Sequence, residues 1–136
     1  AALNHMTGRV RCFQADATKP APAFLGKFDM IISNPPYITG EEMRELPPSV
    51  ADFEPHMALY GGEDGLDFYR AIAKNYTPAL KPGGFLCLEF GMGQGDDVCR
   101  ILSEHGYTIL ERTRDYNDRE RAVLAQYGRK DENYGD

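Results

Sequence analysis

The stretch FDMIISNPPY, residues 28–37, decides the fold of this chain. Its first six residues form an almost continuous apolar run, which is typical of a strand in the middle of a parallel sheet that is covered on both faces. Pro35 and Pro36 end the strand, because proline has no N–H for a sheet ladder and disfavours helical geometry in the residue before it. We therefore predict a stiff turn at the carboxyl end of a buried strand, where open α/β sheets bind ligands.

The rest of the chain alternates between strand and helix patterns. Asp64 is expected to cap a helix that begins near Leu66, and residues 81–84 are expected to end that element. Asn117-Asp118 is expected to form the tip of a hairpin. This order predicts an α/β sheet that is mostly parallel, with an antiparallel pair of strands at its C-terminal edge. Strands are expected at residues 10–15, 28–33, 85–90, 107–112 and 121–127, and helices at 41–46, from 66 to a break at Pro78, and from the loop at 91–95 to 104.

The bulk composition indicates one globular domain without a membrane anchor. The chain has 136 residues, 42% hydrophobic and 26% charged, which suffices for one core and not for two ordinary domains. It has no apolar stretch long enough to cross a bilayer, and its first residues lack the pattern of a signal peptide. Cys12, Cys87 and Cys99 have no paired spacing and sit among apolar neighbours. We expect buried, reduced thiols, no metal site and a cytoplasmic location.

The formal net charge of −6 argues against nucleic acid as the main partner. Proteins that hold a phosphate backbone usually present a basic face or stripe. Here the densest basic group, Arg112, Arg114, Arg119 and Arg121, is interleaved with acidic residues at positions 111, 115, 118 and 120. Tight nucleic-acid binding by this chain is therefore not expected.

The turn after residue 33 carries groups suited to hold a planar amide. Asn34 offers a side-chain carboxamide, Pro35 a backbone carbonyl without a ladder partner, and Tyr37 an aromatic ring. Each also has a purely structural interpretation, as a turn residue, a rigid proline and a packing aromatic. We favour function for Asn34 and Tyr37, both roles for Pro35, and a scaffold role for Pro36. Such a turn suits an enzyme that methylates nitrogen.

Further motifs accompany this turn and point to one family. The chain resembles roughly the C-terminal two-thirds of the catalytic domain of the HemK-type protein-(glutamine-N5) methyltransferases, which modify peptide chain release factors. Asn-Pro-Pro-Tyr alone is shared with several nitrogen methyltransferases, whereas its combination with FEP and LExGxxQG is far more specific. The resemblance spans nearly all of residues 7–127. In its first half it rests on residues 32–38 (ISNPPYI), on 53–55 (FEP) with Ala58-Leu59, and on Gly61-Gly62 with 64–66 (DGL). In its second half it rests on Gly83-Gly84, on Leu88-Glu89 with Gly91 and Gln94-Gly95, and on 114–116 (RDY) with Arg119.

The resemblance implies a class I, Rossmann-like methyltransferase that uses S-adenosylmethionine and acts on a release factor. It implies that the Asn34 side-chain oxygen and the Pro35 carbonyl accept hydrogen bonds from the substrate amide, while Tyr37 walls that amide. Two acceptors on the two N–H groups would orient the amide and favour charge build-up on nitrogen during transfer. Asn34 also borders the cofactor. Asp16 is placed near the adenine, although a cap of the following loop explains it equally well.

The family pattern also includes segments that are absent before residue 10: two strands with a glycine-rich loop and an acidic residue, and a small helical domain. We therefore expect one truncated catalytic domain, with residues 1–9 as the remnant of a helix or linker and 128–136 as a flexible tail. Alone, such a fragment is expected to be inactive and to bind S-adenosylmethionine poorly.

The truncation has a consequence for the sheet. In the family the strands run in the order 3-2-1-4-5-7-6, so the strand at 28–33 would lose its neighbour and expose an aggregation-prone edge. We predict that either residues 10–15 pair with this edge or two copies of the chain form a homodimer through it.

Three residues or segments outside the turn carry expectations as well. Glu89, inside an apolar strand, needs a partner, and structural pairing is favoured over substrate contact. Residues 53–55 are expected to close over the site. Arg114, Asp115 and Arg119 are expected to form a structural ion network.

Two alternative functions stay open. An exocyclic-amine N-methyltransferase acting on DNA or RNA could use the same turn, after extracting the base and stacking it on an aromatic ring. The chain as given could also be a non-catalytic folded module.

Overall fold

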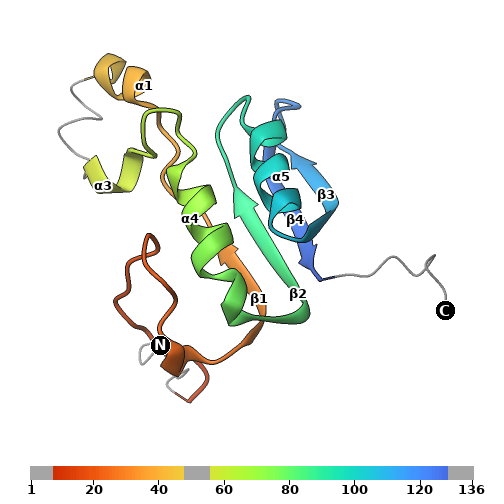
Figure 1. Ribbon diagram of the computed structural model, residues 1–136. Coiled ribbons are helices and arrows are strands. Elements are labelled where there is room, and N and C mark those ends of the chain that lie inside the picture. Colours follow the sequence, from red (N-terminus) through yellow and green to blue (C-terminus); the bar gives the residue numbers. More distant parts are fainter. Residues whose placement is uncertain (1–7, 48–55, 129–136) are drawn as a thin grey trace.

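The structure, a computed structural model, describes residues 8–47 and 56–128 (Figure 1). All predicted elements are present except the strand at 10–15, and the predicted terminal segments lie almost wholly outside the described residues. Within these residues, no helix combines the length and the apolar composition needed to span a bilayer. The elements are η2 (Ala23–Leu25), β1 (Phe28–Ser33), α1 (Gly40–Glu45), α3 (His56–Leu59), α4 (Asp67–Asn75), η3 (Thr77–Ala79), β2 (Leu80–Glu89), α5 (Gly95–Glu104), β3 (Tyr107–Arg114) and β4 (Glu120–Tyr127).

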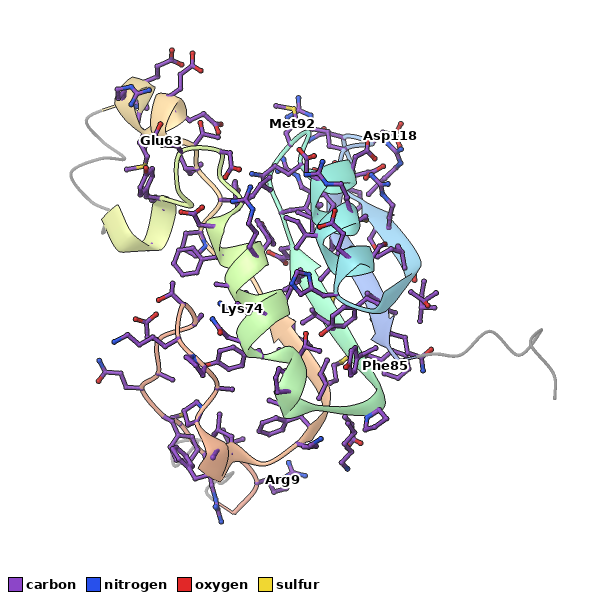
Figure 2. The ribbon with its side chains drawn as sticks, in the orientation of Figure 1. Arg9, Glu63, Lys74, Phe85, Met92 and Asp118 are labelled. Carbon is purple, nitrogen blue, oxygen red and sulfur yellow. The ribbon has the colours of Figure 1, made fainter. Side chains whose placement is uncertain are left out.

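The four strands form one mixed sheet in the order β1-β2-β4-β3. β1 and β2 pair in parallel, while β4 runs antiparallel to both β2 and β3. This order matches the 4-5-7-6 half of the sheet implied by the family resemblance. Among the described residues, the β1–β2 pair is parallel, and the β2–β4 and β3–β4 pairs are antiparallel. The loops at the carboxyl ends of β1 and β2 lie where Figure 2 labels Glu63 and Met92, and Arg9 marks the opposite end.

One face of the sheet is covered by α4 and α5, which lie side by side across the strands (Figure 1). Leu86 and Leu88 of β2 pair with Ala125 and Val123 of β4, and all four side chains are buried against these helices. Full burial of one such side chain contributes about 1.5–3 kcal/mol, so this face stabilises the fold. The predicted helical stripe is confirmed, since α4 buries Tyr69, Ile72 and Ala73.

The opposite face of the sheet is open. Met30 and Ile32 of β1 are 44% and 70% exposed, although they pair with Phe85 and Cys87 of β2. The prediction that β1 is covered on both faces is therefore wrong for the described residues, because α4 and α5 both lie on the other face. β1 keeps the apolar pattern of a strand that is buried on two sides.

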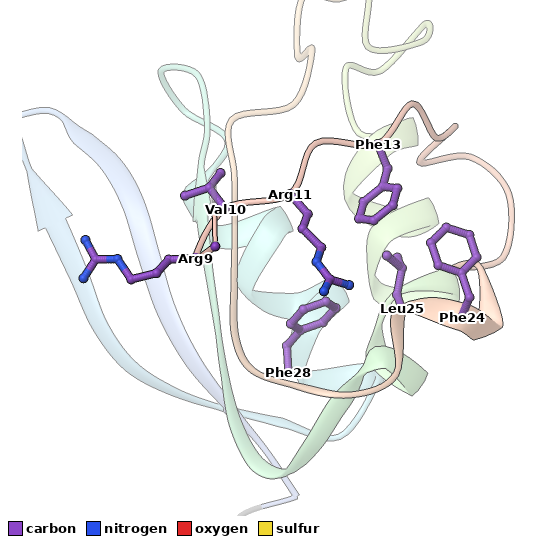
Figure 3. Close-up of a pocket in the computed structure, with 8 residues that line it drawn as sticks. Arg9, Val10, Arg11, Phe13, Phe24, Leu25 and Phe28 are labelled. Atoms are coloured by element: carbon purple, nitrogen blue, oxygen red, sulfur yellow. The ribbon is translucent and has the colours of Figure 1, made fainter. Parts of the chain in front are cut away.

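Residues 10–15 are not a strand, so the prediction that they pair with β1 is wrong. They belong to a segment, residues 8–25, that is tied to the end of α4 by a 3.2 Å hydrogen bond from the Ala21 N–H to the Asn75 carbonyl. Cys12 in this segment is exposed, contrary to the expected burial. Apolar side chains of this segment surround a hollow and do not join the sheet (Figure 3). An apolar pattern forms a strand only where a neighbour supplies hydrogen bonds, and no strand among the described residues pairs with this segment. A homodimer through the free edge of β1 stays a prediction.

The start of β2 and the N-cap of α4 differ from the prediction. β2 begins at Leu80 and not at residue 85, and residues 81–84 form a bulge between the pairs Phe28–Leu80 and Met30–Phe85. The N-cap of α4 is Leu66, so Asp64 is not the cap. The Asp64 carboxylate accepts the Leu66 N–H at 3.0 Å and thereby shapes the turn before the helix.

The β3–β4 hairpin is organised by the Asp115 carboxylate. It accepts hydrogen bonds from the N–H groups of Asn117 and Arg119, at 2.8 and 3.1 Å, and from Nε of Arg121 at 2.9 Å. This corrects the predicted ion network: the ionic partner of Asp115 is Arg121, while Arg119 contributes its backbone. Arg114 pairs with two other acidic residues of the same hairpin.

Candidate active site

β1 ends at Ser33, as predicted, and the residues Asn34, Pro35, Pro36 and Tyr37 follow it at the carboxyl end of the sheet. We call these four residues the NPPY turn. The turn lines a hollow of about 210 Å³ together with Ile38 and two residues of α3, Ala58 and Leu59. The hollow therefore lies between the end of β1 and α3.

The NPPY turn is fixed at its far end by backbone hydrogen bonds. The Ile38 N–H donates to the Leu59 carbonyl at 2.9 Å, and the Gly61 N–H donates to the Ile38 carbonyl at 2.8 Å. A Cβ at Gly61 would lie 2.7 Å from both the Pro36 carbonyl oxygen and the Tyr37 Cα. Only glycine permits this approach, so the turn and the loop after α3 meet backbone to backbone.

The acceptors of the NPPY turn differ in their hydrogen-bond partners, and Pro35 is buried. The Tyr37 carbonyl accepts a hydrogen bond from Gln94 Nε2, and the Ile38 carbonyl is taken by Gly61. In the part of the chain that the structure describes, no donor bonds the Asn34 side chain or the Pro35 carbonyl, and Asn34 is exposed. These are the two acceptors to which the sequence assigned the substrate amide, and their roles stay predictions.

The Tyr37 ring contacts the core as well as the hollow. It rests on Gly91, where a Cβ would lie 2.6 Å from Tyr37 Cδ2, and it is half-buried. Behind it, the Tyr69 hydroxyl donates to the Glu89 carbonyl at 2.8 Å. Burial first, and then Tyr37 and Glu89, raise the pKa of Tyr69 above its usual value, so it stays a neutral donor. The ring is thus held by packing, in a place where it can also wall a ligand.

Asp16 lies in the exposed turn at residues 16–19, apart from the hollow. Its carboxylate accepts hydrogen bonds from the Thr18 N–H at 2.9 Å and from the Thr18 hydroxyl at 2.6 Å. These bonds and the nearby Lys19 lower the pKa of Asp16. The geometry fits the capping interpretation, and no described interaction joins Asp16 to the NPPY turn. Of the two residues expected at the cofactor, Asn34 alone lines the hollow.

Two other expectations concern Glu89 and residues 53–55. Glu89 is exposed at the end of β2, so the prediction that it needs a partner is wrong, because a hydrated carboxylate carries no burial cost. Residues 53–55, expected to close over the site, lie outside the described residues.

Gln94 has no role in the sequence-based scheme, yet its side chain reaches the NPPY turn. The available signal was its place in the LExGxxQG motif, which belongs to the family resemblance. Local sequence gave no indication of its partner, since Tyr37 lies 57 positions away.

Comparison with known proteins supports the resemblance. No protein-family model matches the chain. Release factor glutamine methyltransferase from Clostridium acetobutylicum is 45% identical over 75% of this chain, and the match covers 36% of that protein. The protein of the same name from Rhodospirillum rubrum is 45% identical over 78% of this chain and is covered to 33%. The chain thus spans about a third of the length of these relatives.

A solved structure supports the fold. The crystal structure of TrmN from Thermus thermophilus matches 93% of this chain and 31% of its own, with a TM-score of 0.54 and 18% identity. At this identity the likeness concerns the fold alone, and it agrees with the predicted Rossmann-like α/β sheet. The sequence matches show that the chain is similar to release factor glutamine methyltransferases over about a third of their length.

Proposed function

We propose that this chain is the substrate-binding part of an enzyme that methylates the side-chain amide nitrogen of a glutamine in a peptide chain release factor. The observation that carries the proposal is that Asn34 and Pro35 line a small hollow and that no described donor bonds the Asn34 side chain or the Pro35 carbonyl. A primary amide has two N–H groups, so two acceptors match it. The names of the curated relatives supply the same substrate.

The role of the NPPY turn in this reaction would be to orient the substrate amide. A primary amide nitrogen is a weak nucleophile, because its lone pair is delocalised into the carbonyl. Hydrogen bonds to Asn34 and Pro35 would hold the nitrogen in one position and stabilise positive charge on it as the new bond forms. S-adenosylmethionine, if bound, would supply the methyl group from its sulfonium and leave as the thioether, and the proton lost from the nitrogen would pass to water.

The partner and the location follow from this substrate. The protein would bind S-adenosylmethionine and a release factor, and it would act in the cytoplasm, where release factors meet ribosomes. The nucleic-acid alternative is less well supported, because none of the residues that line the hollow is basic.

A chimera tests the proposal, since the chain spans a third of its relatives. This chain would replace its matching segment in the Clostridium acetobutylicum relative, and labelled methyl transfer to release factor, DNA and RNA would be measured. We expect label on a release-factor glutamine, and a loss on the order of 100-fold in kcat for Asn34→Ala. Asn117→Ala, in the β3–β4 hairpin, is the matched control and should leave transfer unchanged. Label on nucleic acid alone would establish the alternative.

A further inference from the structure

The Gln94 carboxamide joins three loops at the carboxyl end of the sheet. Its Oε1 accepts the Gly91 N–H at 2.8 Å, and its Nε2 donates to the Tyr37 carbonyl at 3.1 Å and to the Gly65 carbonyl at 3.3 Å. Gln94 is the N-cap residue of α5 but makes no side-chain capping bond to that helix. Its polar atoms are therefore committed to the loops and not to its own helix.

The three loops are packed around this carboxamide without spare room. A Cβ at Gly65 would lie 2.7 Å from Gln94 Nε2, and one at Gly91 would lie 3.1 Å from Oε1. The Tyr37 ring also packs on Gly91. The loop that holds Gly91 and Gln94 therefore contacts the NPPY turn both through this packing and through the hydrogen bond from Gln94 to the Tyr37 carbonyl. A change in the Gln94 side chain must therefore move the end of the turn.

We propose that Gln94 is a positioning residue, which acts on the substrate amide through Asn34 and Pro35. By holding the Tyr37 carbonyl, it fixes the end of the NPPY turn and occupies an acceptor that would otherwise compete for the substrate N–H groups. Asn34 and Pro35 are then the acceptors that face the hollow. The inference rests on the proposed function and names the residue that gives the site its geometry.

The chemistry of the contact requires glutamine. The two carbonyls need N–H donors and the Gly91 N–H needs an acceptor, and a carboxamide supplies both. Glutamate would place a second oxygen against two carbonyl oxygens. Methionine keeps the length of the side chain but offers no N–H donor.

The first test uses the chain as given and does not require activity. Hydrogen exchange at the Ile38 and Gly91 amides, and the NMR shifts of the Asn34 side-chain amide, would be compared in wild type, Gln94→Glu and Gln94→Met. We expect exchange to accelerate at least about tenfold and the Asn34 signals to move. Gln126→Glu is the matched control, because Gln126 also donates to a backbone carbonyl, that of Gly83 in the bulge of β2 at 3.0 Å, at the other end of the sheet. Unchanged Ile38, Gly91 and Asn34 signals in both Gln94 variants would overturn the proposal.

The second test separates positioning from folding and from the proposed function. In the chimera, Gln94→Met should lower kcat about 100-fold and change KM for the release factor by less than about threefold, since misplacement affects the reacting geometry. An equal loss for Gln126→Met, or a kcat that does not fall, would overturn the positioning role. A wild-type chimera that methylates no release factor would overturn the proposed function, and the exchange measurement would still decide whether Gln94 fixes the turn.

Discussion

The two ends of the sheet are built in different ways. At the carboxyl end, the NPPY turn, the loop before α4 and the loop after β2 meet backbone to backbone and share the Gln94 carboxamide. At the amino end, residues 8–25 surround a hollow of about 510 Å³ whose apolar lining stays partly in solvent, with Phe13 55% and Phe24 69% exposed (Figure 3). Loops at the first end hold one another, whereas the segment at the second end is tied to α4 by the Ala21–Asn75 hydrogen bond and has a ring contact between Phe13 and Phe24.

Two glycines with nearly the same φ show the difference. Gly65 has a φ of 75° and Gly26 a φ of 73°. An added Cβ at Gly65 would overlap the Tyr37 carbonyl, while at Gly26 it would meet nothing within 4 Å. The comparison teaches that the candidate site is preorganised by its loops and not by the sheet alone.

The largest expected effect comes from this pair. Gly65→Ala and Gly26→Ala should each lose about 1 kcal/mol of unfolding free energy, because a side chain is unfavourable at positive φ. Gly65→Ala should lose about 1–3 kcal/mol more, because its methyl group must displace the NPPY turn or Gln94. Urea unfolding of both variants measures the difference. Equal losses would mean that the carboxyl end yields as easily as the amino end.

Hydrogen exchange compares the two ends in the unmodified chain. The Ile38 and Gly61 amides bond across loops, whereas those of Lys19 and Leu25 bond within local turns. Since opening the first pair requires packed loops to separate, we expect their exchange to be about 100-fold slower after correction for intrinsic rates. Protection of Lys19 and Leu25 at the level of Ile38 would show that the amino end is equally well fixed.

The sequence predicted the elements wherever burial by a neighbour matches the local pattern. The stripe of Tyr69 and Ile72, the run at β1 and the hairpin strands were all readable, because apolar periodicity reports which side chains a core would bury. The same signal failed at residues 10–15 and on the open face at Ile32. In both places the apolar pattern predicts buried side chains, but no described part of the chain covers them.

The candidate site was predicted in part, for a related reason. Asn34 and Pro35 were found because proline forbids the strand to continue, which is a local rule. Gln94 was not, because its bonds to Tyr37 and Gly65 join residues 57 and 29 positions apart. Contacts of this kind depend on the fold and leave no trace in a local pattern.

The strand that links the two ends offers a third test. If the apolar face and free edge of β1 pair with a second copy, light scattering should show a dimer in wild type and a monomer in Ile32→Lys. Tyr116→Lys is the control, because Tyr116 is a fully exposed aromatic side chain on the β3–β4 hairpin. Both variants should keep monomer stability within about 0.5 kcal/mol, as is usual for surface positions. A wild-type chain that stays monomeric at high concentration would exclude the homodimer.

The smallest effect concerns charge at the carboxyl end. Arg121 first, and then the N–H groups of Arg119 and Asn117, lower the pKa of Asp115 below its ordinary value of 3.8. A carboxyl whose pKa is lower in the folded state stabilises that state above the unfolded pKa, and the contribution disappears as pH falls through the folded pKa. The β3–β4 hairpin should therefore loosen below about pH 3.8, and the Asp115 carboxyl carbon should titrate by NMR with a midpoint under that value. Asp115→Asn should weaken the hairpin at neutral pH and remove this part of its acid dependence. A midpoint at or above 3.8 would mean that packing, and not the Asp115–Arg121 pair, holds this end of the molecule.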